Sequence, residues 1–314
     1  ITTNRILSTQ IPADKSQALP KSKMPSTSED HYKTIITYAQ TTQTLAQRLM
    51  ISTVENFSGR FNLIKRLRRY EDEGKTSADP DIWHTLVNCF GLDLQLLNSS
   101  LSNIPKTGPL VLVANHPFGL LDSTILAYIF SQTRLDYRII AHQVFLKAPH
   151  LLPFVLPIYF DDTKQAMMAN VQTRRQALRL LSNGAAIGIF PGGTVSTSAK
   201  PFSKPMDPRW RAFTARLILK SQATVVPVYF DGQNSRLFQL ASHVHSTVRV
   251  GLLLREFEKR VDTSVRVVIG QPIAQSDIQL YANDTPKLMD FLRSRTYSLS
   301  PTPLDSYEYG YDFD

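Results

Sequence analysis

A histidine and an aspartate six positions apart follow an apolar run and could together move a proton. Residues 111–114 are β-branched and aliphatic, which predicts a buried strand that ends at Asn115, His116 and Pro117. His116 would lie at a strand end, where α/β proteins place ligands, and imidazole accepts protons near neutral pH. Asp122, in the first turn of the following helix, could hold the other ring nitrogen. An aspartate at a helix start also serves as a plain cap, so both interpretations stand.

Two glycine-containing turns also follow predicted strands. The first glycine turn, residues 192–196, comes after an apolar run at 185–190, and the second glycine turn, residues 232–235, comes after a run at 224–230. Glycine lets the backbone approach a ligand, and successive N–H groups can cradle an oxyanion, although such turns also occur without ligands. Because the carboxyl ends of parallel strands meet at one sheet edge, the three turns are predicted to form one site.

These residues must be positioned by the predicted strands and helices around them. Because those strands and helices alternate along the chain, the sequence predicts an α/β fold with a mixed, mostly parallel central sheet flanked by helices. Further strands are expected at 92–97, 137–145, 158–160 and 265–269, and the segment 248–254 suits a helix or a strand. Helices are expected at 31–50, 52–70, 79–90, 169–183 and 210–221. Pro149, Pro153 and Pro157 recur at every fourth position, which predicts an apolar loop.

Four segments are expected along the chain. Residues 1–30 are polar and predict a mobile arm, residues 31–90 an N-terminal helical region, and residues 91–300 the α/β domain. Residues 301–314 carry acidic side chains and no basic ones, which predicts a disordered tail that could fold back on a basic face.

Charge and composition narrow the function classes. The chain has 314 residues, 42% of them hydrophobic, and a formal charge of +9, which suits anionic lipid, an acidic carrier protein or nucleic acid. Its single cysteine, Cys89, excludes an intramolecular disulfide and a cysteine-rich metal site. No signal peptide or membrane span is evident. Nucleic-acid binding is disfavoured because the basic residues lack interleaved aromatic residues or a known motif.

One basic cluster stands out in the N-terminal helical region. Residues 60–69 include five basic side chains opposite apolar residues at helical spacing, a pattern that can lay a helix on an anionic membrane or simply face water. The basic side chains are Arg60, Lys65, Arg66, Arg68 and Arg69. This region is therefore expected to face the membrane.

Three blocks, in order, resemble those of the glycerolipid acyltransferase (PlsC-like) superfamily. They are Asn-His-Pro-Phe-Gly-Leu-Leu-Asp at 115–122, Phe-Pro-Gly-Gly-Thr-Val-Ser at 190–196, and Val-Pro-Val-Tyr-Phe-Asp-Gly-Gln-Asn-Ser at 226–235. The Pro-Phe-Gly and Gly-Gln-Asn-Ser segments are most similar to the haemolysin-like branch, related to enzymes that acylate ornithine and glycine lyso-lipids. The resemblance covers residues 50–275. The chain has no G-x-S-x-G, P-loop or G-x-G-x-x-G motif that would compete with this interpretation.

The resemblance implies a lyso-lipid O-acyltransferase that needs no metal or cofactor. His116 would be the general base that deprotonates the acceptor hydroxyl, which attacks an acyl thioester of acyl carrier protein or coenzyme A, and Asp122 would orient the imidazole. The acceptor would meet Asn115, Lys147 and the first glycine turn, and the acyl or thioester side would meet the second. The residues implied in the two turns are Gly192, Gly193, Thr194 and Ser196, and Gly232, Asn234 and Ser235.

Two departures from the superfamily pattern bear on the acceptor. Five residues, not four, separate His116 from Asp122, a spacing that the haemolysin-like branch shares. The usual Glu and Arg of the Phe-Pro-Glu-Gly-Thr-Arg-Ser block are Gly192 and Val195 here. Because an arginine fork suits a phosphate, an amino-acid lyso-lipid is a better expected acceptor than lysophosphatidic acid. The alternatives are a 1-acylglycerol-3-phosphate acyltransferase and a non-catalytic peripheral lipid-binding protein. The implied location is the cytoplasmic face of the cell membrane, without a span.

Overall fold

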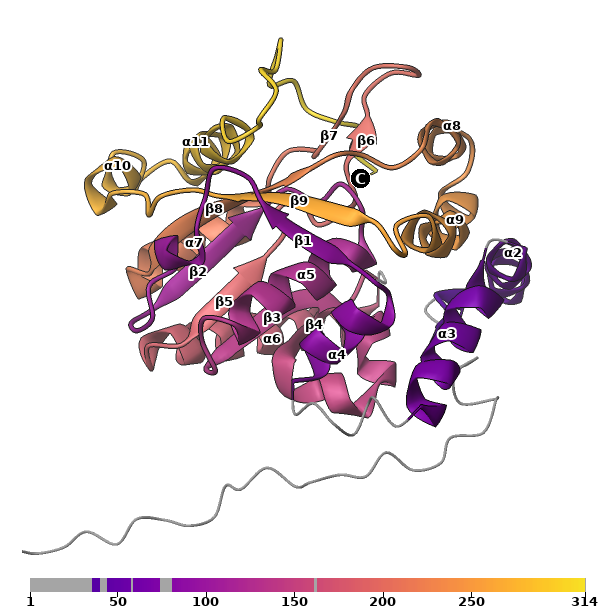
Figure 1. The fold of residues 1–314 in the computed structure, drawn as a ribbon. Helices are drawn as coiled ribbons and strands as arrows, with labels where there is room; N and C mark the ends of the chain where they lie inside the picture. The colour runs from indigo at the N-terminus through magenta and orange to yellow at the C-terminus, as the bar shows by residue number, and fades with distance from the viewer. Residues whose placement is uncertain (1–35, 40–43, 58, 74–80, 161–162, 314) are drawn as a thin grey trace, which may run out of the picture.

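A central sheet with helices on both faces forms the body of the computed structural model, which describes residues 36–39, 44–57, 59–73, 81–160 and 163–313 (Figure 1). Within those residues the sheet has seven strands in the order β1-β9-β8-β2-β5-β3-β4. Their bounds are β1 Asp93–Leu96, β2 Leu110–Ala114, β3 Tyr137–His142, β4 Val155–Ile158, β5 Ala186–Ile189, β8 Thr224–Asp231 and β9 Ser264–Ile269. A separate antiparallel pair joins β6 Thr197–Ser198 to β7 Pro205–Met206.

The strand directions confirm the mixed, mostly parallel sheet. Strands β8, β2, β5, β3 and β4 run parallel to one another. Strand β9 pairs antiparallel to β8, and β1 pairs parallel to β9, so these two strands run in the opposite direction. The carboxyl ends of β2, β5 and β8 therefore lie side by side at one edge of the sheet.

Helices cover both faces of the sheet. Their bounds are α2 Leu45–Asn56, α3 Arg60–Asp72, α4 Ile82–Cys89, α5 Leu120–Ser131, α6 Lys164–Ser182, α7 Ala212–Ser221, α8 Arg236–Val244, α9 Ser246–Glu258, α10 Gln275–Gln279 and α11 Thr285–Tyr297. The 3₁₀ helices are η2 Leu101–Asn103, η3 Gln143–Lys147 and η4 Pro149–Phe154. The segment at 248–254, which suited either element, lies in α9.

Strand β2 shows how the sequence builds the two hydrophobic cores. All five of its residues are buried, because both faces of the strand are covered. Leu110, Leu112 and Ala114 belong to a core shared with α4, α5 and α9, while Val111 and Val113 belong to a second core shared with α6, α7 and α11. Each such aliphatic side chain contributes roughly 1.5–3 kcal/mol on burial. Packing on both faces therefore fixes the strand whose end carries His116.

The helix predicted at 52–70 is wrong as one element. Helix α2 ends at Asn56 and α3 begins at Arg60, with Gly59 between them at φ 92. A Cβ at Gly59 would lie 2.8 Å from Cγ of Glu258, so both the backbone angle and the close approach require glycine. The arm at 1–30 lies outside the described residues, as do 31–35 and 40–43 of the helix predicted at 31–50. In the described part of that segment, residues 36–39 are not α-helical and α2 begins only at Leu45, so the helix predicted there starts too early.

The proline-rich segment is also more regular than predicted. Instead of a loop it forms the 3₁₀ helix η4, and β4 begins at Val155 rather than at 158. Pro157 is tolerated inside β4 because that strand is last in the sheet order, where a missing N–H group leaves no partner unpaired. The strand predicted at 137–145 ends at His142, whose Nδ1 accepts a hydrogen bond from Val144 N and so caps η3.

The C-terminal segment is not disordered, and it does not lie on the basic cluster of α3. The buried Arg293 of α11 donates hydrogen bonds to the carbonyls of Tyr307 and Glu308. Gly310 N then donates to Asp207 O, and Asp312 pairs with Arg211 at 3.3 Å. The acidic composition predicted a tail in solvent. Instead, backbone carbonyl groups of the segment accept hydrogen bonds from the buried Arg293 and so hold it against α11.

Candidate active site

The His116 imidazole and the Asp122 carboxylate form a hydrogen-bonded pair where β2 gives way to α5. His116 Nδ1 lies 2.9 Å from Asp122 Oδ2. The same oxygen accepts hydrogen bonds from the backbone N–H groups of Phe118 and Gly119, at 2.8 and 2.9 Å. Gly119 has φ 90, a backbone angle that glycine adopts readily, and this sharp entry to α5 turns Asp122 back toward the histidine. Asp122 is therefore both the helix cap and the partner of the ring.

Burial and hydrogen bonding act in opposite directions on Asp122. Its side chain is fully buried, and this burial raises the carboxyl pKa, while the hydrogen bonds from His116, Phe118 and Gly119 oppose the rise. The His116 ring also stacks on Phe190, with the ring centres 4.2 Å apart. Because Nδ1 faces Asp122, Nε2 is the ring nitrogen left to meet a substrate. The histidine side chain keeps 15% of its surface exposed for that contact.

Asn115 is fully engaged with the backbone of a neighbouring strand. Its Nδ2 donates to Phe230 O at 2.9 Å, and its Oδ1 accepts from Phe230 N at 2.7 Å. Both ends of the amide thus tie the end of β2 to β8. These bonds give Asn115 a positioning role beside His116, and its predicted contact with the substrate stays a prediction.

The first glycine turn is bound directly to the His116 loop. Ser196 N donates to His116 O at 2.8 Å, and Ser196 Oγ donates to Asp207 Oδ1 at 2.5 Å. Gly193 has φ 72, and a Cβ there would meet nothing within 4 Å, so this glycine borders open space. Gly192 packs against Asp207 instead. The turn therefore lies beside the His116 loop with Gly193 and Thr194 half-buried, and their predicted contact with the acceptor stays a prediction.

The second glycine turn lies on the opposite side of the His116 loop. Gly232 sits against Phe118, where a Cβ would come within 2.6 Å of the ring. Ser235 caps α8, and its Oγ donates to Glu256 Oε1 at 2.6 Å, so this hydroxyl is structural. The Asn234 side chain is buried, and neither of its amide atoms has a hydrogen-bond partner in the described part of the chain. Asn234 therefore keeps free polar atoms in this turn.

Lys147 belongs to a different cluster from His116. Its Nζ donates to Thr37 O at 2.7 Å, in a group that includes the buried carboxyl of Glu55 and the Arg60 guanidinium. Among the described residues, no hydrogen bond or ion pair joins Lys147 to His116 or to either glycine turn. The predicted contact between Lys147 and an acceptor thus stays a prediction, and the structure shows instead how this lysine holds the N-terminal segment.

The burial of Lys147 predicts a stability that rises in mildly alkaline solution. Burial lowers the pKa of Lys147 to about 8, while in the unfolded chain a lysine keeps its proton to about pH 10. Between these values the unfolded state binds more protons, so the free energy of unfolding increases with pH. Urea unfolding at pH 7.5, 8.5 and 9.5 should show this increase relative to Lys147→Met. Parallel pH profiles for the two proteins would contradict it.

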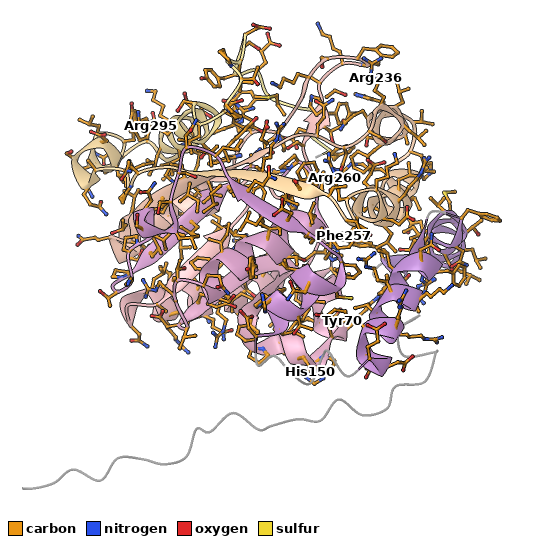
Figure 2. The ribbon with its side chains drawn as sticks, viewed as in Figure 1. Tyr70, His150, Arg236, Phe257, Arg260 and Arg295 are labelled. Carbon is orange, nitrogen blue, oxygen red and sulfur yellow. The ribbon has the colours of Figure 1, made fainter. Side chains whose placement is uncertain are left out.

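Three residues of the site were missed by the sequence analysis. The Asp207 carboxyl accepts from His116 N and Ser196 Oγ, the Arg249 guanidinium donates to Thr194, and the Arg260 guanidinium lies 4.3 Å above the Phe118 ring. Arg260 follows α9 and lies beside β9 (Figure 2). Burial lowers the pKa of Arg260, and the charges of Asp122 and Glu256 oppose that effect. No local motif marks these residues, because each reaches the site from a distant segment.

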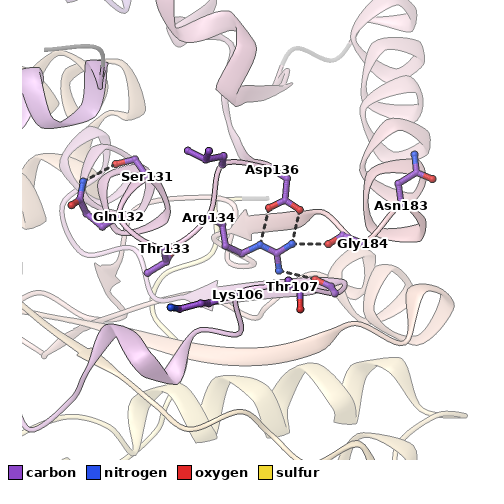
Figure 3. Close-up of a pocket in the computed structure, with 11 residues that line it drawn as sticks. Lys106, Thr107, Ser131, Gln132, Thr133, Arg134, Asp136, Asn183 and Gly184 are labelled. Carbon is purple, nitrogen blue, oxygen red and sulfur yellow. Dashed lines mark hydrogen bonds and ion pairs between the residues drawn. The ribbon is translucent and has the colours of Figure 1, made fainter. Parts of the chain in front are cut away.

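A cavity of about 640 Å³ lies at the other edge of the sheet, where β2, β3 and β5 begin (Figure 3). Arg134 points into its wall, but its guanidinium is already bound by Asp136 and by the carbonyls of Gly108 and Gly184. This arginine fastens three strand starts together. The cavity is thus separated from His116 by the length of the strands. The Arg134 guanidinium in its wall is fully used in hydrogen bonds within the protein.

Comparisons with known proteins agree with the motif blocks. Residues 97–231 match the family model described as Acyltransferase. Two relatives are named lyso-glycine lipid O-acyltransferase. The protein from Phocaeicola vulgatus is 23% identical over 193 residues, 58% of this chain and 65% of the relative, and that from Bacteroides thetaiotaomicron is 24% identical over 195 residues, 58% and 67%. The chain thus spans just under two thirds of the first relative.

A third relative and one solved structure carry a different substrate name. The 1-acyl-sn-glycerol-3-phosphate acyltransferase of Borreliella burgdorferi is 23% identical over 184 residues, 55% of this chain and 68% of the relative. The crystal structure of the 1-acyl-sn-glycerophosphate (LPA) acyltransferase PlsC from Thermotoga maritima aligns with a TM-score of 0.43 and 17% identity, over 83% of this chain and 98% of that one. The match over residues 97–231 includes the His116 loop and the first glycine turn, so this part of the chain resembles the Acyltransferase family, in agreement with the resemblance to PlsC-like acyltransferases drawn from the sequence.

Proposed function

We propose that this chain transfers a fatty acyl group from an acyl thioester to the hydroxyl of a lyso-lipid. The observation that carries this proposal is the His116 ring, held at Nδ1 by the buried Asp122 and free at Nε2, where the ends of β2 and β5 meet. The family match and the names of the relatives supply the reaction class.

In the proposed reaction His116 moves one proton. Its Nε2 accepts the proton of the acceptor hydroxyl as that oxygen attacks the thioester carbonyl carbon. The new C–O ester bond forms and the C–S bond breaks, and the proton passes from the imidazole to the leaving sulfur. Asp122 keeps the ring oriented and stabilises the imidazolium that forms between these two steps. The acyl group passes directly to the acceptor, without an acyl-enzyme intermediate. The donor is an acyl carrier protein or coenzyme A thioester.

We favour an amino-acid lyso-lipid as the acceptor over lysophosphatidic acid. Two relatives carry the name lyso-glycine lipid O-acyltransferase, and Val195 stands where the superfamily usually has an arginine. The second candidate, 1-acylglycerol-3-phosphate acylation, is favoured by the name of the Borreliella burgdorferi relative.

Acyl transfer by the purified chain tests this function. Labelled acyl carrier protein and coenzyme A thioesters would each be combined in detergent with lyso-glycine lipid, lyso-ornithine lipid and lysophosphatidic acid. We expect ester product, formed fastest with an amino-acid acceptor. Faster turnover of lysophosphatidic acid would favour the second candidate. No product with any pair, from a protein that still binds vesicles, would favour a non-catalytic lipid-binding protein.

We further propose that α2, α8 and the adjoining turn rest on an anionic membrane surface. No described helix is both long and apolar enough to cross a bilayer. Helices α8 and α2 both pack on α9, and the three lie in a row along one side of the molecule (Figure 1). Several exposed side chains of α2 and α8, together with Phe57 after α2 and Phe61 at the start of α3, are apolar although they face solvent. This apolar face consists of Leu45, Leu49, Met50, Phe57, Phe61, Leu237, Leu240 and Val244.

The apolar face, rather than the basic cluster of α3, is the better membrane contact. Arg60 is buried beside Glu55, and Arg66 makes paired hydrogen bonds with Asp262 at 2.6 Å, so both cations are held within the protein. Arg236, at the start of α8, is next in sequence to Leu237 of the apolar face (Figure 2). Cations beside an apolar surface are the arrangement that interfacial helices use on anionic lipid.

Polar substitutions on the apolar face should release the protein from vesicles. In Leu45→Gln/Leu49→Gln/Phe57→Ser we expect binding to anionic vesicles to weaken more than about tenfold, since each exposed side chain gains on the order of 1 kcal/mol in the interface. Sedimentation with vesicles measures it. Leu135→Gln is a matched control, because Leu135 is as exposed as Phe57, at 89%, but lies at the cavity on the opposite sheet edge. Equal binding by the triple variant and this control would contradict the placement.

A further inference from the structure

Arg249 of α9 lies buried against the first glycine turn. Its Nη2 donates to Thr194 Oγ1 at 2.8 Å and to Val195 O at 3.0 Å, and only 8% of the residue is exposed. The turn that it contacts belongs to the site. Val195 approaches the position of a Cβ on Gly119 within 3.2 Å, and Ser196 N bonds to His116 O. Arg249 thus bonds to Val195, the residue that precedes Ser196, and Ser196 in turn bonds to the backbone of His116.

The Arg249 guanidinium has no negative partner among the described residues. Its other close contacts are the rings of Phe238 and Phe313, at 5.4 and 4.3 Å, which carry no net charge. Its Nε is buried with no hydrogen-bond partner, and Nη1 donates to none of the described residues. Burial lowers the pKa of Arg249 to about 10, so the side chain still carries its charge at neutral pH.

A buried cation without a counter-ion is costly, and an anionic ligand removes that cost. A guanidinium donates charge-assisted hydrogen bonds to the oxygens of a carboxylate or a phosphate. Both hydrogen bonds from Arg249 to the turn come from Nη2, and the unpaired Nε hydrogen lies on that same edge of the guanidinium, so Nη1 is the donor that remains for an oxygen of such a ligand. Thr194 is half-buried, and its neighbour Gly193 borders open space, so the turn above Arg249 is reachable from solvent.

We propose that Arg249 binds the oxyanion of the acceptor head group, either the carboxylate of an amino-acid lyso-lipid or the phosphate of a lysophosphatidic acid. This inference rests on the proposed function. The superfamily usually has an arginine in the first glycine turn, where this chain has Val195. Arg249 would supply a guanidinium to the same turn from α9. The acceptor is thus held by its anion at Arg249 while its hydroxyl meets His116.

A purely structural Arg249 would also bind Thr194 and Val195, so the test must separate the two roles. A free acid and its methyl ester, which differ in the charge of one group, do this, and a phosphate acceptor adds the second candidate oxyanion. The probes are an N-(hydroxyacyl)glycine with a free carboxylate, its methyl ester, and lysophosphatidic acid of matched chain length. A structural defect slows transfer to all three probes, whereas the loss of an anion contact spares the ester.

We expect Arg249→Gln to lower kcat/KM for the preferred anionic acceptor by about 10- to 100-fold, chiefly through KM, and for the methyl ester by less than about threefold. Arg249→Lys should restore part of the loss, because it restores the charge but not the planar guanidinium that reaches the turn and the ligand at once. The wild type should itself prefer the free acid to the ester. The faster of the glycine and phosphate probes identifies which oxyanion the site takes. Equal losses on acid and ester would overturn the proposal.

Binding to an inactive protein separates this proposal from the function on which it rests. Calorimetry with His116→Ala, with and without Arg249→Gln, measures affinity for the free acid and the ester when no transfer occurs. If the double variant binds the free acid more weakly but binds the ester as before, the anion contact is supported. That holds even if the wild type transfers no acyl group, although the absence of transfer would refute the proposed function. Transfer by the wild type without an Arg249 effect on acid binding would refute the anion contact alone.

Discussion

His116→Ala is expected to reduce acyl transfer at least about 10³-fold. The variant removes the nitrogen proposed to accept the hydroxyl proton, and general-base groups typically contribute 10²- to 10⁴-fold. Thioester consumption and ester formation, followed with labelled donor at saturating acceptor, give kcat for the variant and the wild type. Fold stability should change little, because the imidazole is partly exposed and its one hydrogen bond to a side chain is with Asp122.

The partner residue gives a second test of the same pair. Asp122→Asn keeps the size of the side chain and an oxygen for the backbone N–H groups of Phe118 and Gly119, but it removes the charge beside Nδ1. We expect kcat to fall by about 10²-fold or more, because the neutral amide no longer stabilises the imidazolium.

A distant histidine supplies the matched control. His150, in η4, should tolerate alanine with activity within about twofold of the wild type (Figure 2). If His116→Ala retained activity comparable to that of His150→Ala, Nε2 of His116 would not be the base. A loss in His116→Ala accompanied by unfolding would show only that the ring supports the fold, so the free energy of unfolding of each variant is measured beside kcat.

The parts of this fold that could be predicted are those encoded within one short segment. The run at 110–114 is apolar on both faces, Pro117 and Gly119 break it, and an aspartate opens the next helix, so strand, turn and helix follow from local rules. The His116–Asp122 pair lies inside this unit, which is why its spacing was informative. Parallel strand direction then gathers the turns at one edge, as the general rule for such sheets predicts.

The parts that could not be predicted depend on pairing between distant segments. No local pattern singles out Arg249 or Arg260, and only the packing of α9 and the residues after it beside the His116 loop gives them a role. The two hydrogen bonds of the Asn115 amide to Phe230 of β8 join segments 115 residues apart, so the sequence did not reveal this positioning role. The acidic C-terminal segment looked disordered because its partner, Arg293, is an arginine whose burial no local pattern reveals.

Asp207→Ala is expected to lower the free energy of unfolding by about 3 kcal/mol and to reduce acyl transfer with it. The buried carboxyl accepts from His116 N at 3.1 Å, from Ser196 Oγ at 2.5 Å and from Trp210 Nε1 at 2.8 Å. Removing it leaves three donors without an acceptor, and each buried unpaired group costs about 1–3 kcal/mol before relaxation. Urea unfolding monitored by tryptophan fluorescence and circular dichroism measures the loss. Asp305→Ala, at an exposed aspartate, should stay within about 0.5 kcal/mol of the wild type.

The loss of stability alone would not show that Asp207 joins the His116 loop to the first glycine turn, so a double-mutant cycle with Ser196→Ala is needed. Because the carboxyl and the Ser196 hydroxyl share one hydrogen bond, the cost of Asp207→Ala should be about 1 kcal/mol smaller when Ser196 is already alanine. The same cycle measured on kcat tests positioning, since a turn released from Asp207 no longer fixes His116. Additive effects in both cycles would mean that Asp207 supports the fold without linking the two turns.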